Sequence, residues 1–149
     1  MIKNINEQAP VKASSEINIS AKADTVWKII TDFKNWNKWN SDIKELSING
    51  EVEKGTVFNW KAGPAKITST IQHVEPPTFI SWTGKMIGIS AVHVWEIIPT
   101  DRITIVKTSE SWDGLLVKLM KRKMQKMLRN SLDTGLQYLR KEAERRTES

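Results

Sequence analysis

A histidine and a carboxylate fall on the same face of two neighbouring strands expected near the end of the chain. Successive side chains of a strand point to opposite faces, and polar residues mark the outward set: Glu96 in residues 89–98, and Lys107 and Ser109 in residues 102–112. This alternation turns His93, Thr108 and Glu110 toward the interior. Pairing across the short turn sets His93 beside Thr108, with Glu110 diagonal to it. The sequence therefore predicts an imidazole close to a carboxylate inside the protein.

Such a pair admits three interpretations. A carboxylate beside the His93 imidazole in an apolar cavity could hold a base near neutral pH, abstract a proton next to a ketone or assist a dehydration. The pair could instead contact a ligand without chemistry. It could also be structural, with His93 and Glu110 satisfying each other or nearby backbone groups, or Glu110 lying at a cavity mouth. His93 and Glu110 are therefore candidate catalytic residues, and the sequence does not choose among the three roles.

Alternation along the other strands, and helical spacing after residue 115, extend the predicted interior. The expected lining is mostly apolar and aromatic with a few polar points, as in a small-molecule site. The candidate ligand-binding residues are Phe58, Trp60, Ile67, Ser69, Ile71, Ile80, Trp82, His93, Trp95, Val106, Thr108, Glu110, Met120, Met124 and Met127.

Several of these assignments have an alternative. Methionine adapts its shape to varied partners, so the three methionines form either a flexible ligand wall or ordinary core. Trp36 and Trp39 belong to a short helical turn and read as a buried corner or as a gate over the pocket, whereas Trp27 reads as core. Trp60 and Trp82 lie on short strands, where a bulge would turn them to the opposite face.

Other kinds of site find little support. The chain has two histidines and no cysteine, and no metal-ligand spacing, so we expect no metal and no cofactor. His73, close to Pro76-Pro77, is expected near a strand end at the surface. Gly84–Gly88 is followed by a strand and not by a helix, so it predicts a hairpin loop and not a phosphate cradle.

The expected order of elements is a strand, two short helices, six strands and a long helix. Short turns between successive strands indicate an antiparallel meander. Residues Leu115 to about Arg145 contain no proline and one glycine, Gly135, and predict one amphipathic helix that covers the open face of the sheet. The expected strands are 11–20, 43–49, 56–61, 65–75, 78–83, 89–98 and 102–112, and the expected helices are 23–32, 35–39 and 115–145.

Length and charge bound the possible classes of protein. A chain of 149 residues is expected to form one domain over 1–149, with a core about 11–144. Polar residues 1–10 lack a signal-peptide core, and the absence of cysteine fits a reducing cytoplasm, so we expect a cytoplasmic protein. The segment from Leu115 to Arg146 has ten Lys/Arg and three Asp/Glu, a charge of +7. The whole chain has a net charge of +6, so the remaining residues sum to −1. Such a helix could meet an anionic membrane or an acidic protein, or could be a solvated face without a partner.

Four short motifs in order give the chain a family resemblance. They are Val26-Trp27, then residues 35–40 (NWNKWN), then His93-Val94-Trp95-Glu96, then residues 110–114 (ESWDG) before the last helix. This set resembles the polyketide cyclase/dehydrase and lipid-transport proteins of the START-related, Bet v 1-like (SRPBCC) superfamily over about residues 11–144. The resemblance implies an α+β helix-grip fold, in which a seven-stranded curved antiparallel sheet wraps around a long C-terminal helix, with two short helices after strand 1.

These patterns lead to three functional hypotheses. The first is binding of a hydrophobic small molecule, lipid- or polyketide-like, between the sheet and the C-terminal helix. The second is a polyketide cyclase/dehydratase that uses His93 and Glu110. The third is a membrane- or protein-interaction module that acts through the basic helix, in a monomer or homodimer. Nucleic acid is not an expected partner, because the tryptophans are assigned to the interior and are not interleaved with the basic residues.

Overall fold

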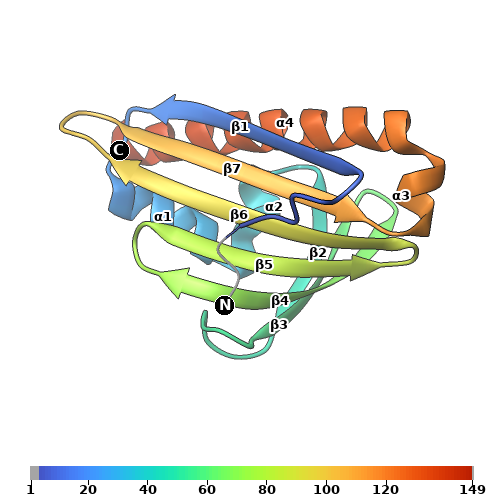
Figure 1. The fold of residues 1–149 in the computed structure, drawn as a ribbon. Coiled ribbons are helices and arrows are strands. Elements are labelled where there is room, and N and C mark those ends of the chain that lie inside the picture. Colours follow the sequence, from blue (N-terminus) through green and yellow to red (C-terminus); the bar gives the residue numbers. More distant parts are fainter. Residues whose placement is uncertain (1–3, 149) are drawn as a thin grey trace.

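The computed structural model describes residues 4–148, which form one curved antiparallel sheet and a long helix that crosses its inner face (Figure 1). The sheet has seven strands in the order β1-β7-β6-β5-β4-β3-β2, so each strand from β2 to β7 lies beside the next one in the chain, and β1 closes the far edge. The strands are β1 (Val11–Ile19), β2 (Ile43–Ile48), β3 (Val57–Ala62), β4 (Ala65–Glu75), β5 (Phe79–Met86), β6 (Ile89–Pro99) and β7 (Thr104–Asp113). The predicted α+β helix-grip fold is confirmed.

The helices differ from the prediction in one respect. After β1 come α1 (Ala23–Thr31), a single 3-10 turn η1 (Phe33–Asn35) and α2 (Trp36–Trp39). The C-terminal region holds two helices, α3 (Leu115–Leu119) and α4 (Lys121–Glu148), where one was expected. Met120 lies between them with φ −122° and ψ 39°. The break lets α3 hold the β5–β6 turn while α4 runs across the sheet, a change of direction that a continuous helix could not make.

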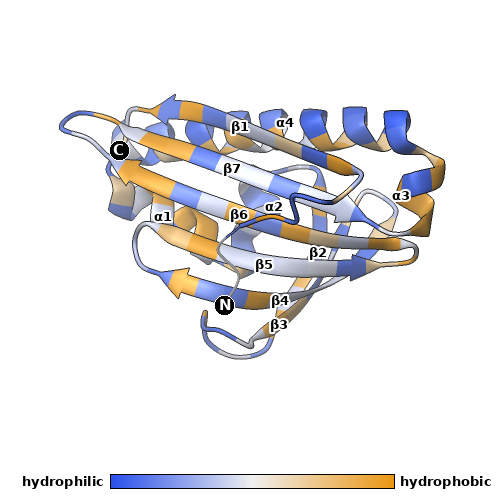
Figure 2. Cartoon of the chain, viewed as in Figure 1, coloured by the Kyte–Doolittle hydropathy of each residue, from blue (hydrophilic) through white to orange (hydrophobic). Residues whose placement is uncertain are grey.

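The core divides into a large and a small cluster along α4. Buried residues of α4 recur every three or four positions and turn one face of the helix to the sheet; Figure 2 shows the opposite face as hydrophilic. Leu136 and Leu139 pack with α1, η1 and the sheet in the large cluster, which includes Phe33 and Phe58. Leu128 and Leu132 pack with β1 and α3 in the small cluster. The sheet is therefore closed firmly at its α1 end.

The register between β6 and β7 differs from the sequence prediction by two residues. β6 continues to Pro99, which pairs with Thr104, so the turn is longer than the one assumed. As a result His93 lies directly opposite Glu110, and Thr108 lies opposite Trp95. The predicted arrangement, with Thr108 opposite His93 and Glu110 diagonal, was wrong in register and right in the face on which the three residues lie.

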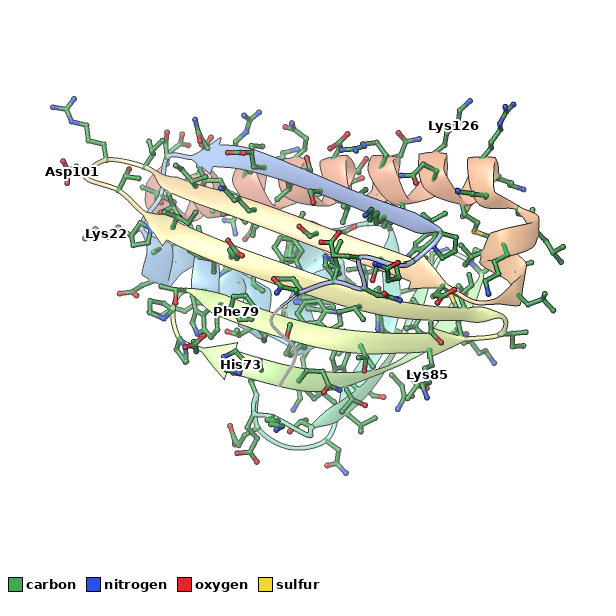
Figure 3. The ribbon with its side chains drawn as sticks, in the orientation of Figure 1. Lys22, His73, Phe79, Lys85, Asp101 and Lys126 are labelled. Atoms are coloured by element: carbon green, nitrogen blue, oxygen red, sulfur yellow. The ribbon has the colours of Figure 1, made fainter. Side chains whose placement is uncertain are left out.

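A second irregularity changes the direction of His73. The β4–β5 register shifts between Ile71 and His73, so that His73 pairs with Ser81 and leaves the face of Ile71. On the outer face its ring meets the ring of Phe79 edge-on, with the centroids 5.4 Å apart. Its Nε2 lies 2.8 Å from the carboxylate of Glu75. Side chains on this outer side, including His73 and Phe79, are visible in Figure 3.

No helix within residues 4–148 combines the length and the apolar character that a transmembrane span requires.

Candidate functional site

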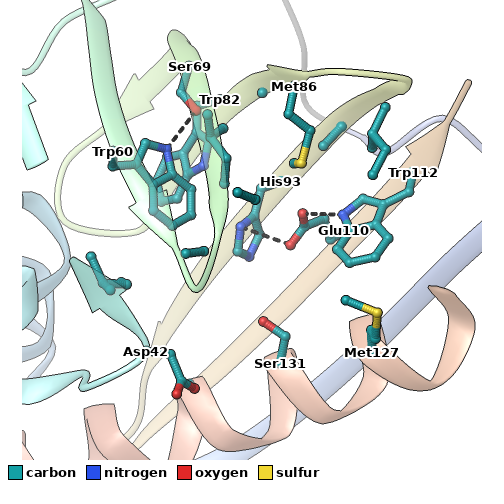
Figure 4. A pocket seen from close by; sticks show the side chains of 18 of the residues that line it. Asp42, Trp60, Ser69, Trp82, Met86, His93, Glu110, Trp112, Met127 and Ser131 are labelled. Carbon is teal, nitrogen blue, oxygen red and sulfur yellow. Dashed lines mark hydrogen bonds and ion pairs between the residues drawn. The ribbon is translucent and has the colours of Figure 1, made fainter. Parts of the chain in front are cut away.

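A cavity of about 650 Å³ lies between the inner face of the sheet, α2 and the α3–α4 region. Figure 4 shows part of its wall, with indole rings and the His93–Glu110 pair on the sheet side and residues of α4 opposite. The lining is mainly aromatic and aliphatic, which is the composition of a site for an apolar small molecule.

The sheet contributes most of the predicted residues that line this cavity. They come from β3 to β7 and from α4. The predicted residues found at the wall are Trp60, Ile67, Ser69, Trp82, His93, Trp95, Glu110, Met124 and Met127.

The remaining predicted lining residues lie elsewhere. Four of them belong to the large cluster, where α1 and the second half of α4 fill the space above the sheet, and the rings of Phe58 and Phe33 stack 4.7 Å apart. Thr108 is buried behind His93, and Met120 packs in the small cluster at the helix break. The residues moved from wall to core by these contacts are Phe58, Ile71, Ile80, Val106, Thr108 and Met120. Strand alternation identified the inner face correctly but not the part of it that the helices cover.

The sequence did not point to several parts of the wall. The segment after α2 supplies Asp42, the β3–β4 turn supplies Pro64, and α4 supplies Gly135. A Cβ built on Gly135 would have no neighbouring atom within 4 Å, so the helix has open space in front of it at this point. A glycine in the middle of an otherwise regular helix was the available signal, because it costs helix stability and needs a reason.

His93 and Glu110 lie side by side on the sheet side of this wall (Figure 4). His93 Nδ1 is 3.2 Å from Glu110 Oε1, and each side chain is 15% exposed. The imidazole lies between Trp82 and Trp95, with ring centroids 5.2 Å and 5.1 Å away. Two neighbouring strands, β5 and β6, therefore hold the imidazole in an aromatic slot, and the adjacent strand β7 carries its carboxylate partner.

Two further side chains complete a hydrogen-bonded chain. His93 Nε2 is 2.7 Å from Thr108 Oγ1, and the Thr108 hydroxyl is also placed to donate to the Val94 carbonyl at 3.3 Å. Trp112 Nε1 donates to Glu110 Oε2 at 2.6 Å. If Thr108 donates to Val94, His93 donates from Nε2 and accepts at Nδ1 from a protonated Glu110. If Thr108 donates to His93, then Nδ1 donates to an ionised Glu110.

Burial changes the acidity of both members of the pair. Desolvation lowers the pKa of His93 to about 3, and desolvation raises the pKa of Glu110 to about 7 against the opposing hydrogen bond from Trp112. No Lys or Arg side chain is paired with Glu110 among the described residues. Below pH 7 the pair is therefore held mainly as neutral imidazole and carboxylic acid, and the acid is the group that titrates near neutrality.

The indole N–H groups near the cavity differ in whether they have a hydrogen-bond acceptor. Trp60 Nε1 donates to Ser69 Oγ at 3.1 Å, and Trp36 Nε1 donates to the Ile30 carbonyl at 2.9 Å. Trp95 is 8% exposed, and its Nε1 is buried without a hydrogen-bond partner among the described residues. An unpaired buried donor costs stability, so the wall carries one unsatisfied polar group next to His93.

The entrance is marked by lining residues that are also exposed. They lie on the segment after α2, on the two hairpins and on α4: Asp42, Pro64, Lys66, Ile87, Met127 and Ser131. One side of the entrance is fixed by the backbone, since Leu116 N donates to the Gly88 carbonyl at 3.2 Å. A Cβ on Gly114 would lie 2.3 Å from the same carbonyl oxygen, so only glycine fits there.

A metal centre and a glycine-rich loop were the two other kinds of site to compare with the structure. Among residues 4–148, no group of three or more His, Asp or Glu side chains is arranged to hold a metal ion. Gly84 lies within β5 and lines the cavity, so the predicted loop over Gly84–Gly88 is in fact a strand end followed by a tight turn.

Comparison with known proteins agrees with the fold. A family model described as "Polyketide cyclase / dehydrase and lipid transport" matches residues 10–144. No curated protein matches the chain by sequence.

Solved structures share the architecture at low sequence identity. A hypothetical protein of Helicobacter pylori superposes with a TM-score of 0.82 at 14% identity, over 96% of this chain and 98% of its own. A START superfamily protein from Mycobacterium smegmatis gives 0.77 at 14% identity, over 90% and 97%. The Zhui aromatase/cyclase from Streptomyces sp. R1128 gives 0.79 at 15% identity, over 91% and 94%. At these identities the likeness shows the fold alone.

Proposed function

The chain belongs to the polyketide cyclase/dehydrase and lipid-transport family, and from this premise we propose that its cavity binds a hydrophobic small molecule of lipid- or polyketide-like character. The observation that carries the proposal is the cavity itself: about 650 Å³ of space, walled by indole rings and aliphatic side chains and open at one side. Such a space in water favours an apolar occupant, because each apolar group that leaves water adds to the affinity.

The polar groups on the sheet side of the wall limit the ligand's chemistry. The Glu110 acid and the unpaired Trp95 N–H lie on either side of His93 along the wall. A carbonyl or hydroxyl oxygen on the ligand could accept a hydrogen bond from the acid. A carboxylate on the ligand would be repelled once Glu110 ionises above its pKa of about 7. We therefore favour a ligand with an apolar body and an uncharged oxygen function.

Ligand binding can be tested directly. Native mass spectrometry of freshly purified protein should show a retained small molecule, and tryptophan fluorescence should respond to added polyketide-like phenols or fatty alcohols, because several indoles line the cavity. A variant with Gly135→Phe should bind neither, since its ring would enter the cavity, whereas Gly135→Ala should bind normally. Equal binding by wild type and Gly135→Phe would contradict this use of the cavity.

A second candidate is a cyclase or dehydratase, and the 3.2 Å contact between His93 Nδ1 and Glu110 Oε1 favours it. The two groups lie within hydrogen-bond reach at the wall of an open cavity, as acid–base chemistry requires. The pKa values assign the roles. Glu110, with its pKa near 7, can donate its proton to a departing hydroxyl, and the carboxylate that remains can accept the proton lost from the α-carbon, so that only water is released. His93, with its pKa near 3, orients Glu110 and is a weak base.

One substitution, Glu110→Gln, distinguishes catalysis from ligand binding alone. Glu110→Gln keeps the size of the side chain and a hydrogen bond to His93 but cannot transfer a proton. Loss of water from a β-hydroxy ketone probe, followed by mass spectrometry, should disappear in Glu110→Gln while binding of the probe persists. No turnover by the wild-type protein with such probes would leave binding alone as the function of the cavity.

A further inference from the structure

Three large aliphatic side chains project into solvent at one end of the molecule. Ile87 is 95% exposed, Leu115 72% and Leu119 73%, and we call these three residues the apolar tip. Ile87 lies in the β5–β6 turn and the two leucines in α3, and the two elements touch through the hydrogen bond from Leu116 N to the Gly88 carbonyl. Figure 1 places this turn and α3 at the same end of the sheet.

The exposure of the tip is a property of the α3 face and not of isolated residues. Leu115 and Leu119 are four positions apart, so they share one side of the helix. Val117, between them, is fully buried, and Leu116 lines the cavity. α3 is thus apolar on both sides, and within residues 4–148 nothing covers its outer side. An exposed apolar face of this kind marks an interaction surface.

Positive charge surrounds the apolar tip. The sequence from Gly114 to Leu132 has no Asp or Glu, and none of the nearby cations has an ion pair among the described residues. Farther along α4, by contrast, Arg145 and Arg146 pair with Glu142. Figure 3 shows Lys85 and Lys126 extending outward at this end of the molecule. The basic collar consists of the exposed residues Lys85, Lys118, Lys121, Arg122 and Lys123.

We propose that the apolar tip and the basic collar dock the protein onto an anionic lipid bilayer. Ile87, Leu115 and Leu119 would enter the interfacial region, and the collar would lie among the headgroups. Protruding aliphatic side chains ringed by cations suit a bilayer, which accepts both without a matching shape. An acidic protein partner would satisfy the cations but would also need a fitted groove for the three aliphatic side chains.

Docking in this way would bring the cavity entrance to the membrane. Ile87 belongs to both the tip and the entrance, and Met127, 47% exposed, continues the apolar surface from the entrance along α4. An apolar ligand could then pass between bilayer and cavity with little exposure to water. The docking surface consists of exposed side chains and can be tested without any cavity ligand, so it does not depend on the function proposed above.

The test is flotation of the purified protein with vesicles of phosphatidylcholine containing about 30% phosphatidylserine, and with pure phosphatidylcholine, from about 0.05 to 0.3 M NaCl. We compare wild type with a tip variant (Ile87→Ser, Leu115→Ser, Leu119→Ser) and a collar variant (Lys121→Glu, Arg122→Glu). The matched controls are Val57→Ser, an exposed apolar residue on β3, and Lys141→Glu near the other end of α4. All changes are at exposed positions, and circular dichroism checks that each variant folds.

Wild type should bind the anionic vesicles, and binding should weaken with salt. The tip variant and the collar variant should each lose at least about tenfold in vesicle affinity, while both controls bind as wild type does. Absence of wild-type binding to anionic vesicles would overturn the proposal. A tip variant that binds like wild type would also overturn it, because the attraction would then be charge alone, as for an acidic protein partner.

Discussion

Replacing Glu110 with Gln should stabilise the protein above pH 7 and change the way its stability depends on pH. Burial raises the pKa of Glu110 from 4.5 to about 7, so the folded state holds this proton more tightly than the unfolded state does. Stability is therefore lost as the pH rises from 4.5 to 7. Above pH 7 this pKa shift lowers the free energy of unfolding by about 3 kcal/mol, and Glu110→Gln removes this loss.

His93 acts in the opposite direction and sharpens the test. Burial lowers the pKa of His93 from 6.5 to about 3, so its contribution to stability is lost as the pH falls below 6.5, by about 2 kcal/mol at pH 5. Between pH 4.5 and 6.5 the two slopes cancel in the wild-type protein, which should show nearly constant stability there. Glu110→Gln should expose the His93 slope and lose about 2 kcal/mol between pH 6.5 and 5.

The measurement is urea denaturation followed by tryptophan fluorescence at pH values from 5 to 8.5, with the free energy of unfolding taken from the midpoint and slope. Glu96→Gln, an exposed carboxylate on the outer face of β6, is the control and should follow wild type throughout. Parallel pH profiles for wild type and Glu110→Gln would refute the assignment of a buried, titrating acid to this position.

Three further predictions concern the cavity and the core. Gly135→Ala should raise the free energy of unfolding by about 1 kcal/mol, because it adds helix propensity where a Cβ has open space, and urea denaturation would detect it; an unchanged or lower value would show that the site is already filled. The hydrogen bond from Trp112 to Glu110 Oε2 lowers the pKa of Glu110, so Trp112→Phe, which removes this bond, should raise that pKa above about 7 in a carbon-13 NMR titration. Trp27→Phe, outside this contact, should leave the pKa of Glu110 unchanged. Phe33→Ala should lose about 3–5 kcal/mol, because Phe33 is 2% exposed and stacks on Phe58, and a loss below about 1 kcal/mol would contradict the closed packing of the α1 end.

The sequence predicted the faces of the strands better than their pairing. Alternation placed His93, Thr108 and Glu110 on one side because the period of a strand is fixed by its backbone. Register depends on turn length, and the turn after Pro99 is longer than the one assumed, so Glu110 moved to the position directly opposite His93. In the same way, the shift after Ile71 could not be read from the regular sequence of β4.

The boundary between core and cavity was not available from the sequence at all. Phe58 and Trp60 lie two residues apart on the same face of β3, yet the first is packed against Phe33 and the second lines open space. What separates them is the position of α1 and η1 above the sheet, a long-range arrangement that local periodicity does not encode. The break at Met120 has the same origin, since helix spacing continues through it while the tertiary contact at Gly88 bends the chain.

The contact between Gly88 and Gly114 has a consequence for how the entrance can work. Because backbone meets backbone there, with no room for even one added carbon, the β5–β6 turn and the start of α3 form a single rigid edge. Widening of the entrance must then come from the opposite edge or from rotation of the Met127 side chain. The main chain thus fixes this one edge of the entrance, whereas Leu115 and Leu119, which do not line the cavity, lie on its outer side. Substitutions at Leu115 and Leu119 can therefore change the outer surface of α3 without altering this edge of the entrance, whereas a substitution at Ile87 changes both.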